Sequence, residues 1–553
     1  MEMPADPAIQ DSDWRHIAGI QWLFRCGLIA LATFECWNSR FIMNPDGVSY
    51  QDIGDRYWLH DWNAAVSAYW SPLYSWMIAL WLHTARPSIR WEYPAVHLLT
   101  VPIFIGALLA FELLWRELLR WNPEKNSSSL SASLAWAFGY LLFAFIHLVF
   151  HPLEFITPDL IVAAVVYLAS GWMLQFATKR LSISRAILLG VALGCGYLAK
   201  TAMFPFALVV LGTMVVVAWK LRAGARPWAA AALGFFLIST PFIAAIHHKY
   251  HRLTIGDAGK LNVGWVVNAD NAEYADPLHQ THLLSGVPEV FSFAGPIVGT
   301  LPMWYDPTYW CNGIDTHFYL RNVLATFLRN AAQMAGELTL ETGMLTTVVL
   351  FLFLASDDIA LASRRLLTLW PVLVPAGAGI TMYLLISLKA RYYSGFLAVI
   401  CAAVAATSMI QNDEPRRKVL RAASVAFGSV TAITFLWVVV TSHTKSVRSA
   451  EAVQVAQQLG VMGLQPSESV ALIGDGYEEA NWARLGRFTI IAEVPKDNDA
   501  ANAFWSSTAA DQDRVLQLLR RTGARAVVAE VRPATLSQGW EPVSGTYYAV
   551  HFF

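Results

Sequence analysis

Charged residues stand out at four places between the long apolar stretches of this sequence. The segment NPDGVSYQDIGDRYW carries Asp46 and two further aspartates, and TPDL places Asp159 before an apolar stretch. GYLAKTAMF sets Lys200 between two apolar stretches, and LKARYY brings Arg391 and Tyr392 ahead of another. Ionisable groups at membrane depth are costly, so we treat these residues as functional candidates. Carboxylates can accept protons and cations can hold a phosphate, so the pattern indicates acid–base chemistry on an anionic lipid.

The first acidic segment allows two interpretations. Proline, aspartate and glycine favour a turn, and that alone accounts for Asp46. Alternatively, Asp46 lies at the edge of a low-dielectric cavity, where a carboxylate can act as a general base. The residues that follow predict a short helix with Tyr50 on one face and Asp52 and Asp55 on another. We expect Asp55 to contact substrate, and Asp52 and Asp61 to be solvated.

The other candidates also have alternative roles. Asp159 either caps the helix that follows it or contacts the substrate. Lys200 either extends to the membrane surface or binds a phosphate, and Arg391 can hold a phosphate with two hydrogen bonds. His151 and Glu154 precede Asp159 at a His-x-x-Glu spacing, which permits a metal ion but supplies two ligands at most.

The composition predicts that these residues are positioned by membrane-spanning helices. Of 553 residues, 56% are hydrophobic and 14% are charged, whereas soluble domains carry about 25% charged residues. The formal net charge of -1 indicates no nucleic-acid partner, and the five scattered cysteines show no metal-ligand spacing. We predict about eleven spans, at residues 17–38, 94–115, 129–150, 160–177, 186–199, 201–219, 228–246, 342–356, 366–387, 392–410 and 421–441.

The basic residues decide the predicted orientation. With 72–85 as a helix at the membrane interface rather than a span, the loops rich in lysine and arginine all fall on one side. This places the N-terminus in the cytoplasm. The loops 39–93 and 247–330, the short loop 151–160 and the tail then lie outside it. The aromatics of the longer loop either stack on sugars or pack a loop core; they are Trp265, Trp304, Tyr305, Tyr309 and Trp310.

The tail predicts a second domain. After a transmembrane domain of residues 1–445, residues 446–553 alternate helix-like and strand-like stretches. SVALIG, FTIIAEV, ARAVVAEV and YYAVHFF read as strands, and 450–464 and 509–523 as amphipathic helices. Alternating elements of this kind favour a small α/β domain with a mostly parallel sheet.

Several of these motifs resemble the GT-C glycosyltransferases, within them the branch of protein O-mannosyltransferases and lipid A aminoarabinose transferases. NPDGVSYQDIGDRY followed by YWSPLYSWMIAL is similar to the first external loop of that family, and TPDL to its second acidic motif. GCGYLAKTAMFP is similar to its glycine-rich helix ending in lysine, and KARYYSGFLAV to its Arg-Tyr-Tyr segment. The resemblance covers residues 17–410, and it implies an α-helical membrane fold of GT-C type.

The resemblance also implies a reaction. A polyprenyl-phosphate-linked sugar would be the donor, and an external lipid, glycan or protein acceptor would attack the sugar with inversion. Asp46 matches the family's catalytic aspartate, Lys200 and Arg391 would stabilise the leaving phosphate, and Asp159 would orient the substrate or a divalent cation. Tyr50, Asp55 and Tyr392 complete the expected substrate contacts. We therefore expect a bacterial inner-membrane glycosyltransferase whose active site and C-terminal domain are periplasmic. The alternatives are a transporter of lipid-linked sugars and a non-catalytic assembly protein.

Overall fold

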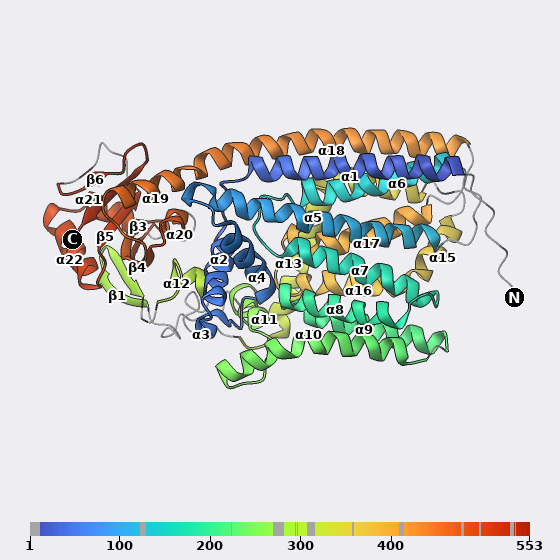
Figure 1. Ribbon diagram of the computed structural model, residues 1–553, viewed down its shortest axis with the longest axis horizontal. Helices are drawn as coiled ribbons and strands as arrows, with labels where there is room; N and C mark the ends of the chain where they lie inside the picture. The colour runs from blue at the N-terminus through green and yellow to red at the C-terminus, as the bar shows by residue number, and fades with distance from the viewer. Residues whose placement is uncertain are drawn as a thin grey trace.

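The structure is a bundle of long helices followed by a small sheet domain at one end (Figure 1). The computed structural model describes residues 11–121, 129–222, 224–268, 281–293, 297–306, 316–354, 359–408, 414–476, 480–496, 499–530 and 538–553, together with 295, 356 and 536. Each of the eleven predicted apolar stretches overlaps helix in the described residues, although 366–387 is interrupted at Leu369 and extends past the end of its helix at Leu384. These helices are α1 (Asp11–Asn38), α5 (Ile89–Arg120), α6 (Ser129–Phe145) with its extension η1 (Ile146–Phe150), α7 (Asp159–Ala177), α8 (Ile183–Ala199), α9 (Met203–Lys220), α10 (Arg226–Tyr250), α14 (Gly343–Leu354), α16 (Trp370–Leu384), α17 (Ala390–Ser408) and α18 (Glu414–Ser449).

The described helices fit a multi-pass membrane protein. By length and composition, seven of them could cross a membrane, or up to nine if each of two bent pairs forms one span. The bent pairs are α13 (Leu320–Leu340) with α14, at 82°, and α15 (Ile359–Thr368) with α16, at 77°. Helix α8 is apolar but shorter. The count of eleven spans therefore stays a prediction.

Small residues bring two helices of the bundle into close contact. A Cβ atom on Gly190 of α8 would lie 1.9 Å from the backbone oxygen of Ala231 on α10, and one on Gly234 would lie 2.6 Å from the oxygen of Ile187. Glycines at such crossings let two backbones approach, as membrane helices often do. The packing against α10 fixes α8, and with it Lys200 at the end of α8.

Short helices close the end of the bundle that faces the sheet domain. They are α2 (Pro45–Trp58), α3 (Trp62–Ala65) and α4 (Pro72–Ala85), all from the first predicted external loop. Figure 1 shows them between the bundle and the sheet. Further along the chain, the predicted external loop 247–330 adds α11 (Ala258–Asn262), η2 (Val263–Val267) and α12 (Pro302–Tyr305). The predicted helix at 72–85 coincides with α4.

Among the described residues, the sheet has seven strands in the order β1-β2-β4-β3-β5-β7-β6. Strand β3 runs parallel to β4 and β5, and the other four pairings are antiparallel. The prediction of a mostly parallel sheet is therefore wrong, although the four predicted strands are found as β3, β4, β5 and β7. The strands are β1 (Thr281–Gly286), β2 (Glu289–Phe293), β3 (Ser469–Gly474), β4 (Thr489–Pro495), β5 (Ala526–Glu530), β6 (Glu541–Pro542) and β7 (Tyr548–Phe552).

Two strands come from the loop between bundle helices. The hairpin β1–β2 belongs to the 247–330 loop, and β2 pairs with β4 through Phe291 opposite Glu493. The sheet is covered by helices α19 (Glu451–Val461), α20 (Asn481–Gly486), α21 (Ala500–Ser506) and α22 (Ala509–Arg521). Val470 and Leu472 of β3 belong to the same buried hydrophobic cluster as Tyr50 of α2 and Tyr74 of α4. The sheet domain and the first external loop therefore share one core.

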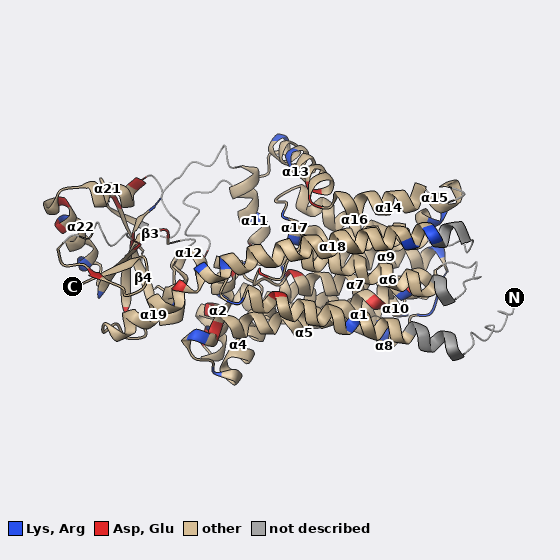
Figure 2. Cartoon of the chain, turned by 90° about the horizontal axis from the view of Figure 1, so that it is seen from above, with Lys and Arg blue, Asp and Glu red and all other residues tan. Residues whose placement is uncertain are grey.

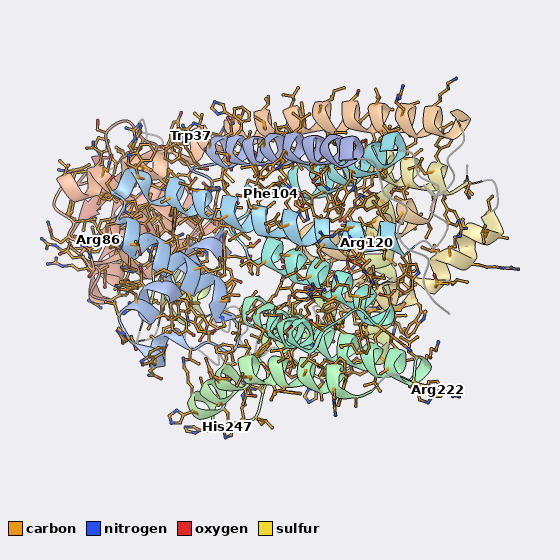
Figure 3. The ribbon with its side chains drawn as sticks, turned by 45° about the vertical axis from the view of Figure 1, so that its right-hand side comes forward. Trp37, Arg86, Phe104, Arg120, Arg222 and His247 are labelled. Atoms are coloured by element: carbon orange, nitrogen blue, oxygen red, sulfur yellow. The ribbon has the colours of Figure 1, made fainter. Side chains whose placement is uncertain are left out.

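Basic residues gather at the opposite end of the bundle. Figure 2 shows lysine and arginine at the ends of α15 and α18 that lie away from the sheet. In Figure 3, Arg120 and Arg222 lie toward this far end, whereas Arg86, which follows α4, lies at the end that carries the sheet. The described residues seen here at the edges of the predicted cytoplasmic loops thus share one end of the molecule.

Candidate active site

Four charged side chains from distant parts of the sequence meet at the sheet-facing end of the bundle. Nη2 of Arg391 on α17 donates to Oδ2 of Asp46 on α2 at 2.9 Å, and its Nε lies 3.5 Å from Oδ2 of Asp159 on α7. Nζ of Lys200, which follows α8, donates to Oδ1 of Asp159 at 2.5 Å. We call Asp46, Asp159, Lys200 and Arg391 the Asp46 cluster. The structure thus brings together four of the residues that the sequence singled out.

Aromatic rings complete the surroundings of the cluster. Nζ of Lys200 lies 3.6 Å from the ring centroid of Tyr392, and the guanidinium carbon of Arg391 lies 5.2 Å from that of Phe155. Cations over ring faces gain electrostatic stabilisation. Tyr50 is buried nearby, and its burial, together with the charges of Asp46 and Asp159, raises its pKa well above the usual value. Its hydroxyl is therefore a hydrogen-bond donor at neutral pH rather than a phenolate.

Asp46 is positioned by the start of α2. Pro45 occupies the first turn of the helix, where its missing N–H costs nothing. Oδ1 of Asn44, the preceding residue, accepts from the backbone N–H of Ile156 at 2.9 Å. A Cβ on Gly47 would lie 2.6 Å from the sulfur of Met43 and 2.9 Å from Cβ of Ile156, so glycine allows this close packing. The loop before α7 and the start of α2 thus fix each other.

The members of the cluster differ in exposure, which separates their possible roles. The side chain of Asp159 is 2% exposed, whereas those of Arg391, Lys200 and Asp46 are 18%, 22% and 31% exposed. Burial disfavours the charged form of Lys200, but Asp159 and two tyrosines outweigh it and raise the pKa of Lys200 to about 12. Asp159 therefore holds both cations from a buried position, while Asp46, Arg391 and Lys200 remain accessible to a ligand.

The second half of α2 carries a different cluster. Nη1 of Arg484 on α20 donates to Oδ1 of Asp52 at 2.8 Å and to Oδ2 of Asp55 at 2.6 Å. Its Nε donates to Glu92 of α5 at 3.1 Å, and Nη2 of Arg487 donates to the other Glu92 oxygen at 2.6 Å. We call these five residues the Arg484 cluster. Asp55, predicted to contact substrate, lies here and not in the Asp46 cluster.

The prediction that Asp52 is solvated is wrong. Asp52 is 3% exposed, and besides Arg484 it accepts from the backbone N–H and the hydroxyl of Thr300 at 2.7 and 3.0 Å. Burial raises the pKa of Asp52, while Arg484 and the Thr300 N–H oppose that rise. Asp61, by contrast, is 43% exposed and accepts from the N–H of Ala64 at the start of α3.

Arg484 and Glu92 are the residues that sequence reasoning missed. Arg484 is 432 residues away from Asp52 along the chain. Neither Arg484 nor Glu92 lies in a recognisable motif. The signal that could have drawn attention to Arg484 is weak: an arginine in an otherwise apolar segment, NWARLG. Such a segment also fits an exposed helix.

The metal interpretation gains no third ligand in the part of the chain that the structure describes. No group of three or more His, Cys, Asp or Glu residues there could hold a metal ion. Glu154 instead accepts from the hydroxyl of Ser442 at 2.6 Å and from Nζ of Lys445 at 2.9 Å. His151 is buried, and its burial lowers the pKa to about 4.

Two of the loop aromatics pack inside the protein. Trp304 and Tyr305 are buried, and the Tyr305 hydroxyl donates to the backbone oxygen of Ala64 at 2.7 Å. The backbone oxygen of Trp304 accepts from the hydroxyl of Ser49 on α2 at 2.6 Å. The packing interpretation therefore fits these two, and Tyr309 and Trp310 lie outside the described residues.

Comparisons with known proteins give a fold but no sequence family. No protein-family model and no curated protein sequence matches the chain. Among solved structures, the chain is similar to apo ArnT, a lipid A aminoarabinose transferase, from Cupriavidus metallidurans, at 12% identity and a TM-score of 0.54. That alignment covers 96% of this chain and 98% of ArnT. ArnT bound to undecaprenyl phosphate matches at 14% identity and a TM-score of 0.51, over 96% and 97% of the two chains. Over nearly its whole length, the chain therefore has the GT-C fold of the ArnT structures, the fold that the sequence resemblance implied.

Proposed function

We propose that this protein is a membrane glycosyltransferase that takes its sugar from a polyprenyl-phosphate-linked donor. The observation that carries the proposal is the Asp46 cluster, in which two partly exposed cations and a partly exposed carboxylate meet at the closed end of a helix bundle. The cations suit a lipid phosphate and the carboxylate suits a proton transfer. The fold supports the same reading, since an ArnT structure of this fold is bound to undecaprenyl phosphate.

The geometry supports different roles for the members of the Asp46 cluster. Arg391 presents a planar guanidinium and Lys200 a point charge, a combination suited to the phosphate of the donor. As the bond between the anomeric carbon and the phosphate oxygen breaks, that oxygen keeps the electron pair, and both cations stabilise the charge. Asp159 would keep them in place, because it contacts both from a buried position.

Asp46 is the group that would accept the proton. An acceptor hydroxyl attacks the anomeric carbon from the side opposite the phosphate, and its proton passes to the carboxylate of Asp46 as the new bond forms. In the structure Asp46 pairs with Arg391. A donor phosphate that draws Arg391 away would release one Asp46 oxygen for this role. Tyr50, buried beside both acids, and Tyr392, under Lys200, would line the sugar and phosphate positions.

The proposed location is the bacterial inner membrane, with the Asp46 cluster and the sheet domain on the periplasmic side. The basic residues at the far end of the bundle support this orientation, because lysine and arginine are enriched in cytoplasmic loops. The acceptor, whether lipid, glycan or protein, would then approach from the periplasm.

Transfer from a panel of radiolabelled polyprenyl-phosphate sugars tests the proposal. Wild-type protein is compared with Asp46→Asn, which keeps the shape of the side chain but removes the base. We expect Asp46→Asn to lower turnover by a factor of about 10²–10⁴ while donor binding persists. Asp61→Asn is the matched control, since Asp61 belongs to the same external loop but not to the cluster, and it should retain turnover.

Two outcomes would contradict the proposal. Full turnover by Asp46→Asn would remove Asp46 from the chemistry. Donor binding without turnover under any donor would favour a transporter or an assembly protein.

A further inference from the structure

The short helix α20 of the sheet domain contacts both ends of α2, the helix that carries Asp46. At one end, Nδ2 of Asn481 donates to the backbone oxygen of Met43 at 2.9 Å, three residues before Asp46. At the other, Arg484 donates to Asp52 and Asp55. One helical turn of the C-terminal domain therefore holds a segment that begins just before Asp46 and ends nine residues after it.

The Arg484 contacts are buried and directional. The side chains of Arg484, Asp52 and Glu92 are each 3% exposed, so these three charges are shielded from water and salt, whereas Asp55 is 25% exposed. A guanidinium has a rigid fork of donors, and here it joins α2 to α5 through carboxylates on both helices. Such a contact fixes the angle and the register of α2 more tightly than apolar packing alone.

The rest of α2 would not hold that position as strictly. The helix has 14 residues, which gives about 21 Å of length, and it is joined to the bundle by the turn before Pro45. Asp55 also forms a hydrogen bond with Nε2 of His83 on α4 at 2.9 Å. Two further polar ties, Ser49 to the oxygen of Trp304 and Asp52 to Thr300, reach the 297–306 segment. In that segment the backbone oxygen of Thr300 accepts from the N–H of Ile490 in β4 at 2.9 Å. Part of the lateral support of α2 thus passes through the sheet domain, by way of Arg484 and of the 297–306 segment.

We propose that Arg484 is a positioning residue that sets the place of Asp46 through α2. Arg484 thereby makes the C-terminal domain a part of the site's framework, although none of the described residues of that domain forms a hydrogen bond or ion pair with a member of the Asp46 cluster. The inference rests on the proposed function for its effect on catalysis. Its structural half, that Arg484 orders α2, stands independently.

Arg484→Gln tests both the ordering of α2 and its effect on catalysis. The substitution keeps hydrogen-bonding groups but removes the charge and the forked set of guanidinium donors. We expect the turnover number to fall by about 100-fold, the size of loss that a displacement of about 1 Å can cause. The KM for the donor should change by less than about threefold, since the phosphate-binding cations are untouched. Arg484→Lys, which restores the charge, should recover part of the turnover. Arg525→Gln is the matched control, as Arg525 lies in the same domain, is 57% exposed and contacts Glu468 at 3.9 Å.

A distance between spin labels on α2 and α5 reports the position of α2 independently of any enzymatic activity. Spin labels are placed at Trp58→Cys, at the exposed end of α2, and at Leu98→Cys, on the exposed side of α5, after replacement of the five native cysteines. We expect a narrow distance distribution in the parent protein and in Arg525→Gln, and a broad or shifted one in Arg484→Gln. Should Arg484→Gln fail to fold, Arg484→Lys takes its place in the same comparison.

The structural role of Arg484 and its effect on catalysis can be refuted separately. A narrow, unshifted distribution in the Arg484 variant overturns the inference whatever the activity. A broad distribution with undiminished turnover overturns the link to Asp46. If the wild type transfers no sugar from any donor, the proposed function fails, while the distances still decide whether Arg484 orders α2.

Discussion

The Asp46 cluster and the Arg484 cluster both include carboxylates of the short helix α2, where Asp46 lies about 9–13 Å along the axis from Asp52 and Asp55. Both combine arginine with carboxylates from distant parts of the chain. In the Asp46 cluster, three of four side chains are between 18% and 31% exposed. In the Arg484 cluster, Arg484, Asp52 and Glu92 are each 3% exposed, and Asp55 and Arg487 at its edge are 25% and 43% exposed. Similar chemistry thus occurs in two different environments.

The difference shows how one set of residue types can serve two purposes. Exposed charges can exchange a partner for a ligand, because water compensates the charge that is released. Buried charges cannot, because an unpaired ion in the interior is costly. The Asp46 cluster is therefore suited to binding and reaction, and the Arg484 cluster to holding elements together. The following predictions test this contrast, beginning with the largest expected effect.

Removing Arg484 from the Arg484 cluster should cost the most stability. Arg484→Met leaves the buried carboxylate of Asp52 without a cation and leaves Glu92 with Arg487 alone. We expect the free energy of unfolding to fall by about 3–5 kcal/mol. Denaturant titration of the purified protein in detergent measures this loss. A loss below about 1 kcal/mol would show that the buried cluster behaves like a surface ion pair.

Removing the arginine from the exposed cluster should instead reduce transfer. Arg391→Met should lower turnover by about 10²–10³-fold, since a charged donor to the leaving phosphate is lost. The cost in stability should be smaller than for Arg484→Met, because Arg391 and Asp46 can be solvated. Parallel transfer assays and denaturant titrations of the two variants provide the check. Equal losses of stability in both would remove the distinction between the clusters.

The sequence was sufficient to predict the helices because their signal is local. Each apolar stretch of α5 to α10 is long enough to be recognised on its own, and α4 was found with the bounds it has. The sheet was harder. Its strands β3, β4, β5 and β7 show as apolar stretches, but the antiparallel hairpin β1–β2 joins from the 247–330 loop, and no local pattern shows that pairing.

The candidate site likewise contains residues that could be predicted from local sequence and residues that could not. Asp46, Asp159, Lys200 and Arg391 could be singled out because each is a charge beside an apolar stretch, where it needs an explanation. Asp52 could not be distinguished from a solvated acid, since its burial depends on Arg484 and Thr300, both far along the chain. Whether a charge is buried depends on its tertiary partners. The pairing of Asp52 with Arg484 and Thr300 cannot be predicted from one sequence, because no local pattern marks it.

A buried histidine beside the Asp46 cluster should make stability depend on pH. Burial lowers the pKa of His151 to about 4, from about 6.5 when unfolded. Its contribution to stability is therefore complete above pH ~6.5 and is lost as the pH falls from ~6.5 to ~4. From about pH 7.5 to about pH 5, the wild type should lose about 2 kcal/mol more than His151→Gln. Denaturant titrations at the two pH values measure the difference, and identical pH dependence in both proteins would refute it.

The smallest effect is expected where an arginine and a carboxylate meet at the surface. Arg525 lies 3.9 Å from Glu468, and their side chains are 57% and 31% exposed. Arg525→Met should change the free energy of unfolding by less than about 0.5 kcal/mol, since water and salt screen such pairs. Turnover should not change, because Arg525 touches neither cluster. Arg525 and Arg484 belong to the same domain and both face acids, so the pair of variants isolates burial as the variable. A loss near that of Arg484→Met would mean that the sheet domain is sensitive to any lost arginine, and burial would no longer explain the role of the Arg484 cluster.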